Sequence, residues 1–176
     1  MTMESMNRRS FLKRTALFAG APWIVPASAL GRTGAGANDR IHIGIIGTGE
    51  RGRSHITDLY DFGDQAQLTA LCDVNLESRR KAKDLLGKMK REEGVACYGD
   101  FRELLADADI DAVIIAVPEH WHAPIAIAAA KAKKHLYLEK PFAYSVVEGR
   151  AIVQAVKENG VVFQHGTQQR SMPQYR

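Results

Sequence analysis

Three glycines, Gly47, Gly49 and Gly52, have the spacing G-x-G-x-x-G directly after the apolar run 41–46. In this pattern the first glycine makes a tight turn, the second lets backbone approach a phosphate, and the third lets a helix pack on a strand. The unpaired N–H groups at the start of that helix favour an anion. The turn therefore predicts a site for a dinucleotide pyrophosphate. We expect all its residues to contribute to cofactor binding: Gly47, Thr48, Gly49, Glu50, Arg51 and Gly52.

A carboxylate follows at a meaningful distance. Asp73 lies 21 positions after Gly52. It follows a second apolar run, 67–71, with Cys72 between them. About 20 residues is the separation at which an acidic side chain at a strand tip accepts hydrogen bonds from the adenosine ribose hydroxyls. Because a carboxylate there also repels a 2′-phosphate, the sequence favours NAD over NADP. The alternative is a strand-end aspartate that only caps the next turn, and Asn75 is expected to cap the helix that follows.

These residues need a scaffold, and the sequence supplies an alternation of strands and helices. We expect strands at 41–46, 67–71, 95–98, 112–117, 135–138 and 161–164, and helices at 51–60, 76–91, 101–106, 123–132 and 145–159. The run 112–117 lacks polar alternation, as a parallel strand covered on both faces does. The prediction is an α/β fold, a Rossmann-type doubly wound parallel sheet whose ligands lie outside the carboxyl ends of the strands.

The first 29 residues are excluded from that domain. The run 7–13, NRRSFLK, resembles the twin-arginine export signature, and an apolar run and an A-x-A-like site at 27–29 follow it. We therefore predict a signal peptide cleaved after Ala29, a flexible linker at 30–39, and a periplasmic or otherwise exported domain at 40–170. A retained membrane anchor is the alternative, but Pro22 and Pro26 interrupt the apolar run and it is too short to span a bilayer comfortably.

Charge and cysteine content narrow the function further. Residues 1–29 hold four basic side chains against Glu4, so the net charge of +4 falls to +1 without them. A nucleic-acid partner is therefore not indicated. Cys72 and Cys97 fall on predicted buried strands, and we expect free, buried thiols rather than a disulfide.

Beyond the glycine turn, three further segments match one family. They are 117–122 (VPEHWH), 139–141 (EKP) and 166–170 (GTQQR), each directly after a predicted strand. With the turn they span nearly all of 40–170, and the chain resembles the N-terminal cofactor domain of the Gfo/Idh/MocA oxidoreductases, in their exported branch. The family includes glucose-fructose oxidoreductase and inositol 2-dehydrogenase.

The resemblance implies roles for particular residues. Lys140 would be the catalytic residue, donating to a substrate hydroxyl and stabilising the alkoxide that forms as hydride leaves, and Pro141 would follow a cis peptide bond. The alternative is a strand-end lysine paired with Glu139 at the surface. Further cofactor contacts are implied for Val117, Pro118, His122, Glu139, Lys140, Pro141 and Gln168. Contacts with nicotinamide or substrate are implied for Gln164, Thr167 and Gln168, and Arg170 either reaches the substrate or only pairs locally. The segment 119–122 also suits a metal, but no third ligand is identifiable and we expect none.

The resemblance also implies a second α/β domain that supplies the substrate pocket, and 171–176 would begin the connection to it. We expect the 176-residue chain to bind NAD(H) but to turn over little or no substrate, and to form a homo-oligomer only with that domain. The leading function is an NAD-dependent oxidoreductase that transfers hydride between nicotinamide and a sugar, cyclitol or derivative. The alternatives are an NAD-dependent glycosidase that works by oxidation, elimination and hydrolysis, and a non-catalytic dinucleotide-binding fragment.

Overall fold

The computed structural model describes residues 40–61 and 65–175. The predicted signal peptide, its cleavage site and the whole of the predicted linker lie outside the described residues. The strands are β1 (Ile41–Ile46), β2 (Ala66–Cys72), β3 (Ala96–Tyr98), β4 (Ala112–Ile115), β5 (His135–Glu139) and β6 (Phe163–Gly166). The helices are α2 (Glu50–Tyr60), α3 (Leu76–Lys88), α4 (Phe101–Ala106), α5 (His122–Lys131) and α6 (Val146–Asn159), with the 3-10 turns η4 (Glu119–Trp121), η5 (Gln168–Ser171) and η6 (Pro173–Tyr175).

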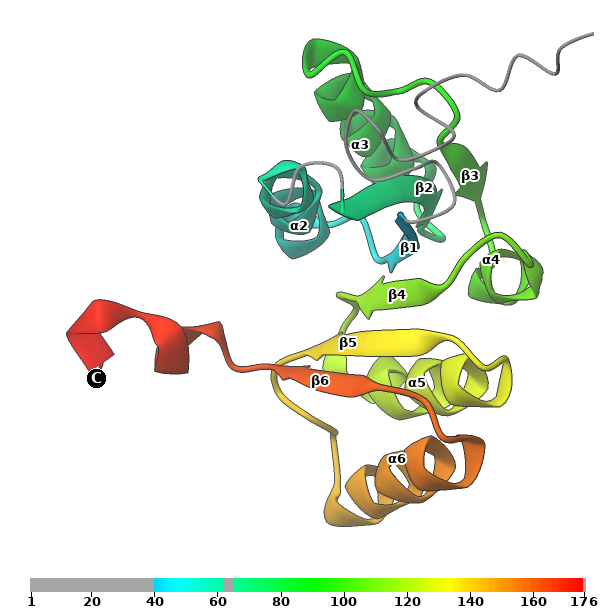
Figure 1. Ribbon diagram of the computed structural model, residues 1–176, viewed down its shortest axis with the longest axis vertical. Helices are drawn as coiled ribbons and strands as arrows, with labels where there is room; N and C mark the ends of the chain where they lie inside the picture. Colours follow the sequence, from blue (N-terminus) through cyan, green and yellow to red (C-terminus); the bar gives the residue numbers. More distant parts are fainter. Residues whose placement is uncertain (1–39, 62–64, 176) are drawn as a thin grey trace, which may run out of the picture. The chain divides into compact units, whose positions relative to one another are not determined.

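The described strands form one parallel sheet in the order β3-β2-β1-β4-β5-β6. This order confirms the predicted doubly wound Rossmann-type sheet. Helices α2 and α3 cover one face, and α4, α5 and α6 cover the other (Figure 1). The strand order reverses between β1 and β4, and ligands of such sheets bind outside the carboxyl ends of the strands at this point. The predicted glycine turn leaves β1 there.

The alternation of side chains along the central strands divides the core between the two faces. Ile45 packs with Ile56 of α2 and Leu86 of α3, whereas its neighbour Ile46 belongs to the cluster on the other face, with Ile152 of α6. All five side chains are at most 2% exposed. Because both faces are covered at its carboxyl end, β1 has buried apolar side chains at the consecutive positions Ile45 and Ile46.

Several predicted boundaries differ from the structure. The strand expected at 112–117 ends at Ile115, and two further differences are larger or shift a whole element. The helix expected at 76–91 ends at Lys88, since Lys90 adopts a positive φ of 55° and the chain turns away. The last strand, expected at 161–164, runs from Phe163 to Gly166, because Gly160 ends α6 at φ 65° and the next two residues only lead into the sheet. This shift pairs Gly166 with Glu139, so the residues after β5 and β6 lie beside each other.

The predicted helix cap is confirmed, and the prediction for the two thiols is confirmed in part. The Asn75 side chain accepts hydrogen bonds from the N–H groups of Glu77 (2.8 Å) and Ser78 (3.4 Å), as predicted for the cap of α3. Cys72 and Cys97 are both free, but only Cys72 is buried and Cys97 is half-buried. No helix in the described part of the chain has the length and apolar character needed to cross a membrane.

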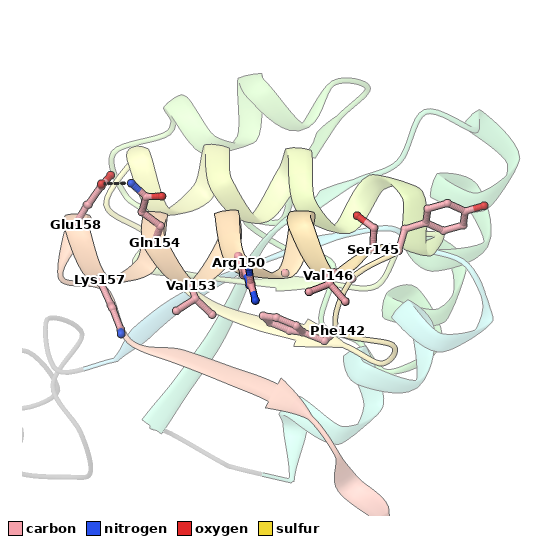
Figure 2. Close-up of a pocket in the computed structure, with 11 residues that line it drawn as sticks. Phe142, Ser145, Val146, Arg150, Val153, Gln154, Lys157 and Glu158 are labelled. Carbon is pink, nitrogen blue, oxygen red and sulfur yellow. Dashed lines mark hydrogen bonds between the residues drawn. The ribbon is translucent and has the colours of Figure 1, made fainter.

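A hollow of about 800 Å³ lies along α6, away from the carboxyl ends of β1 and β4. Figure 2 shows Phe142 beneath the helix, with Val146 and Val153 on the same side and a hydrogen bond between Gln154 and Glu158. None of the predicted site residues lines it. The candidate site therefore has to be sought at the strand ends.

Candidate functional site

The turn between β1 and α2 is shaped by its glycines in two different ways. Gly47 has a φ of +92°, and a Cβ atom there would lie 2.3 Å from the Ala116 carbonyl oxygen. A Cβ at Gly52 would lie 1.9 Å from the Gly47 carbonyl oxygen, so α2 can pack this close to β1 only with glycine at that position. A Cβ at Gly49 would meet no protein atom within 4 Å. Gly47 and Gly52 are required by the protein's own packing, whereas Gly49 faces open space.

The start of α2 is suited to an anion. Gly49 is its N-cap and supplies no side-chain hydrogen bond to the first turn, while α3 and α6 are capped by Asn75 and Ser145. The N–H groups of that turn thus receive no side-chain cap, at the end of the helix where the dipole is positive. The Arg53 guanidinium donates to the Thr48 carbonyl oxygen (2.8 Å), and this hydrogen bond stabilises the turn.

Asp73 ties the same turn to the end of β2. Its Oδ2 accepts from the backbone N–H of Thr48 (2.7 Å) and from the Thr48 hydroxyl (3.2 Å), and its Oδ1 accepts from the N–H of Asn75 (2.8 Å). Asp73 thus stabilises the turn after β2, as the simpler sequence interpretation proposed. It also holds the glycine turn and stays half-buried at the strand tip, where a ribose would have to lie.

A hollow of about 350 Å³ opens beside these residues, at the carboxyl ends of β1, β2 and β4. Of the predicted site residues, Gly47, Gly49, Asp73, Val117 and Pro118 line it. Trp121, from the 117–122 segment, also lines it, and Phe101 and Arg102 add an aromatic ring and a cation that the sequence interpretation did not predict. The Arg102 guanidinium lies 4.6 Å from the centre of the Phe101 ring. A largely apolar hollow with a few polar groups fits a planar ring joined to a ribose.

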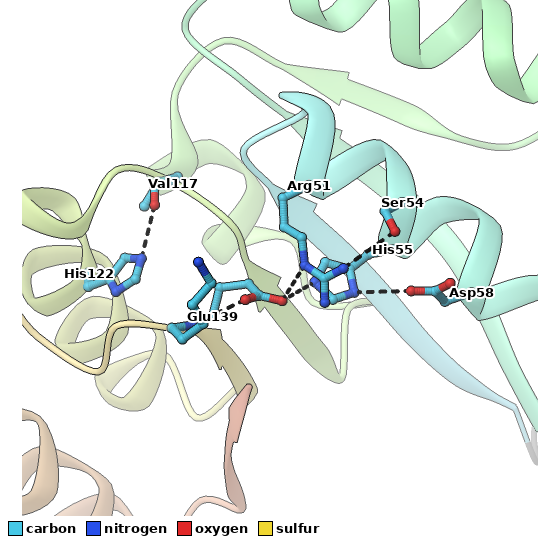
Figure 3. A network of polar contacts seen from close by, with 8 residues as sticks. Arg51, Ser54, His55, Asp58, Val117, His122 and Glu139 are labelled. Carbon is cyan, nitrogen blue, oxygen red and sulfur yellow. Dashed lines mark hydrogen bonds and ion pairs between the residues drawn. The ribbon is translucent and has the colours of Figure 1, made fainter. Parts of the chain in front are cut away.

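Glu139, at the end of β5, is the centre of a buried polar network that reaches α2 (Figure 3). It is 3% exposed. Its Oε1 accepts from Arg51 Nε (2.6 Å) and lies 2.8 Å from His55 Nε2, and its Oε2 accepts from the backbone N–H of Lys140 (3.1 Å). The ion-pair partner of Glu139 is therefore Arg51, and Glu139 contacts Lys140 through the main chain.

Burial and charge act against each other in this network. Burial alone would raise the pKa of Glu139, but hydrogen bonds from Arg51, from His55 and from the next backbone N–H hold that pKa below its ordinary value. Burial and the neighbouring Arg51 guanidinium lower the pKa of His55 despite the attraction of Glu139. The network consequently holds an ionised Glu139 beside a neutral imidazole at neutral pH.

Lys140 lines another hollow, of about 380 Å³, after the carboxyl ends of β5 and β6. Thr167, Gln168 and Arg170 line it as well. The peptide bond between Lys140 and Pro141 is cis, as the resemblance implied. With its amide oriented to satisfy both neighbours, Gln168 donates to the Gly166 carbonyl (2.8 Å) and accepts from Arg51 Nη2 (3.0 Å). Gln164 does not line this hollow, and its amide donates to the His165 carbonyl oxygen (2.9 Å).

His122 joins the loops that follow β4 and β5. It is 1% exposed and begins α5, with Nδ1 2.7 Å from the Pro141 carbonyl oxygen and Nε2 2.9 Å from that of Val117. Both ring nitrogens thus face backbone groups, and cofactor contact by His122 stays a prediction. Across residues 40–61 and 65–175, no group of three His, Cys, Asp or Glu side chains is arranged to hold a metal ion.

The sequence interpretation missed His55, which is 6% exposed and contacts Glu139 from 84 positions away. A signal was present, because His55 is four residues after Arg51 and shares its helical face. The burial of that face could not be read from the helix alone. Glu50 is exposed in the first turn of α2, and Pro141 is exposed after β5.

The glycine turn, the carboxylate at the end of β2 and the six-stranded order together define a dinucleotide-binding domain of the Rossmann type. Comparison with known proteins identifies the family. The model of the GFO_IDH_MocA oxidoreductase family, with its NAD-binding Rossmann fold, matches residues 41–167. The chain belongs to this family of NAD-binding oxidoreductases.

Individual relatives show the range of the family. An alpha-N-acetylgalactosaminidase of Shewanella oneidensis is 33% identical over an alignment of 165 residues that covers 83% of this chain and 36% of that protein. The structure of scyllo-inositol dehydrogenase from Lactobacillus casei with bound NAD(H) and scyllo-inositol is 31% identical, with a TM-score of 0.68 over 78% of this chain and 39% of that one. The WlbA dehydrogenase of Bordetella pertussis, in complex with NADH and UDP-GlcNAcA, is 29% identical, with a TM-score of 0.70 over 77% and 40%.

Proposed function

We propose that this chain is the cofactor-binding half of an NAD-dependent oxidoreductase that transfers hydride between nicotinamide and a sugar, a cyclitol or a derivative of one. The observation that carries the proposal is the open space at Gly49, beside a hollow that Asp73 lines. Lys140 stands at the carboxyl end of β5 in the same sheet, where chemistry on a bound substrate is expected.

The residues fit the cofactor group by group. The uncapped N–H groups of α2 bind the pyrophosphate, and Asp73 keeps acceptor capacity for the ribose hydroxyls. NAD supplies the hydride acceptor when it is bound. Lys140 donates a hydrogen bond to the substrate hydroxyl and stabilises the negative charge that develops on its oxygen. The contacts at Glu139 and Pro141 hold the main chain on either side of Lys140.

Asp73 makes NAD the preferred cofactor over NADP, because three hydrogen-bond donors hold its carboxylate at the strand tip and it cannot move away from a 2′-phosphate without losing them. Titration calorimetry of the chain with each cofactor tests this. We expect tighter binding of NAD than of NADP. We expect Asp73→Asn to reduce this preference by about tenfold, because the substitution keeps the size of the side chain and removes its charge, together with one of its two acceptor oxygens. Equal affinity of the unaltered chain for both cofactors would contradict the assignment.

A second candidate is an NAD-dependent glycosidase that oxidises, eliminates, adds water and reduces its substrate. The similarity to the alpha-N-acetylgalactosaminidase of Shewanella oneidensis favours it. Both candidates begin with hydride removal from a carbinol carbon and assign the same task to Lys140. Glycoside cleavage without net NADH supports the glycosidase, and accumulation of NADH with a sugar or cyclitol supports the dehydrogenase.

The chain spans 36% of the length of the Shewanella relative. The first experiment therefore has to determine the length of the protein chain in its source and whether it carries a nucleotide. Native mass spectrometry of the protein from its source reports chain length and any retained nucleotide together. A longer chain that carries NAD supports the proposal, and a short chain without nucleotide leaves only the fold. Sugar-dependent NADH formation by the isolated 176-residue chain would contradict the expectation that it binds cofactor without turnover.

We also propose that the protein is exported through the twin-arginine machinery. The Arg8-Arg9 pair in the predicted signal peptide, residues 1–29, supports this. Free NAD is scarce outside the cytoplasm, so a cofactor loaded before export of the folded protein would be oxidised and reduced in place. Replacement of both arginines by lysine should keep the protein in the cytoplasm, as measured by cell fractionation. Unchanged export of that variant would refute this part of the proposal.

A further inference from the structure

We propose that His55, together with Arg51, is a positioning residue for Lys140, and that both act through the carboxylate of Glu139. The inference rests on the proposed function, which assigns Lys140 to the substrate hydroxyl. It adds a connection between the helix that we assign to the cofactor pyrophosphate and the lysine at the reacting centre, made by two side chains of that helix.

The two carboxylate oxygens of Glu139 contact different parts of the protein. On one side, Arg51 Nε and His55 Nε2 both approach Oε1, at 2.6 and 2.8 Å. On the other side, Oε2 accepts from the N–H of Lys140 at 3.1 Å. Since Glu139 is 3% exposed, water does not compete effectively for these bonds. The carboxylate is a bridge between α2 and the main chain of Lys140, and its orientation sets the direction in which that residue leaves β5.

Histidine suits this place because it donates a hydrogen bond without adding charge. The ring is packed edge-on against Tyr137, with centroids 5.3 Å apart, and its Nδ1 lies 3.8 Å from Asp58 Oδ2. A neutral imidazole with its hydrogen on Nε2 donates to Glu139 and leaves a single ion pair, Arg51 with Glu139. A second cation in its place would put another positive charge beside the Arg51 guanidinium in the buried part of the network.

Arg51 extends the same connection to the other wall of the Lys140 hollow. Its Nη2 donates to the Gln168 side chain at 3.0 Å, and Gln168 in turn donates to the Gly166 carbonyl at 2.8 Å. Arg51 and His55 are one helical turn apart and lie within two turns of Gly49. The helix that meets the pyrophosphate therefore holds both Lys140 and the loop that faces it.

Amide hydrogen exchange at Lys140 tests the bridge directly in the 176-residue chain. We expect His55→Leu to raise the exchange rate of the Lys140 N–H by about tenfold, because the carboxylate loses one of the donors that orient it. His55→Gln keeps an N–H near the Nε2 position and should restore most of the protection. Leu59→Ala is the matched control, since Leu59 is buried on the same helix, belongs to the apolar cluster and makes no contact with Glu139 in the network described.

Two results would overturn the inference. One is unchanged protection at Lys140 in His55→Leu. The other is an equal, local loss of protection in Leu59→Ala, which would mean that Lys140 responds to loosening of α2 in general. The exchange measurement needs no cofactor, so a failure of the unaltered chain to bind NAD would reject the proposed function and leave the bridge itself standing.

In the complete active protein, a positioning role for His55 predicts an effect on kcat without an effect on the Kd for NAD. His55→Leu should lower kcat by about tenfold or more, leave the Kd for NAD within about twofold, and be rescued in kcat by His55→Gln. A loss confined to NAD affinity would show that His55 serves only to pack α2, and would refute its role at Lys140.

Discussion

Replacement of Gly49 by alanine should separate cofactor binding from folding. Gly49 has φ −60° and ψ −166°, which alanine adopts readily, and its Cβ would meet no protein atom within 4 Å. Alanine is a poorer N-cap than glycine but restricts the unfolded chain more, and these effects nearly cancel, so the free energy of unfolding should change by about 1 kcal/mol or less. The new methyl group would lie in the space that we assign to the pyrophosphate.

The magnitude for binding follows from that overlap. Forcing a methyl group into a filled contact costs about 1–3 kcal/mol, so NAD affinity should fall by about tenfold or more. Gly52→Ala is the matched control, because its Cβ would lie 1.9 Å from the Gly47 carbonyl oxygen, where ordinary contact begins at 3.4 Å. This variant should lose about 2 kcal/mol or more of stability, whether or not cofactor is present.

Urea unfolding and calorimetric titration with NAD measure the two effects independently. The expected pattern is a stable Gly49→Ala variant that binds poorly and a Gly52→Ala variant that is unstable before any ligand is added. If Gly49→Ala binds NAD as tightly as the unaltered chain, the backbone at this position does not approach the phosphates and the reasoning is refuted. If Gly52→Ala is as stable as the unaltered chain, the close packing of α2 on β1 is refuted.

Two further predictions concern titrating groups. Because the pKa values of His55 and Glu139 lie below their ordinary values of 6.5 and 4.5, the unfolded chain takes up each proton first, so stability is lost as pH falls below about 6.5 and again below about 4.5. In urea unfolding between pH 4.5 and 7.5, His55→Gln should remove the upper decline, and an identical profile for this variant would contradict the assignment. Burial, followed by the charges of Asp73 and Asp100, raises the pKa of Cys72 to about 12, so iodoacetamide at pH 7.5 should modify Cys72 only after unfolding. Mass spectrometry of peptides reports this, with the half-buried Cys97 as the internal comparison, and rapid labelling of native Cys72 would be the opposing result.

Much of the fold could be predicted because its signals are local. The spacing of Gly47, Gly49 and Gly52 depends on one turn, and the Asn75 cap depends on N–H groups two and three residues away. The boundaries of β6 were harder to predict, because they depend on pairing with β5 and on where α6 ends, at Gly160. Apolar residues at 161–162 look like a strand by composition, and only the register shows that pairing begins at Phe163.

By itself, the sequence determined the alternation of strands and helices, the anion-binding turn, the acidic residue at the end of β2 and the place of Lys140 after β5. These features follow from periodicity and from contacts within a few residues. Only the tertiary structure decided the partners of Glu139, because Arg51 and His55 lie 88 and 84 positions away and meet it where α2 packs beside β5. It also decided that the Glu139 carboxylate holds the backbone of Lys140, since a buried charge takes the donors that the surrounding fold places within reach.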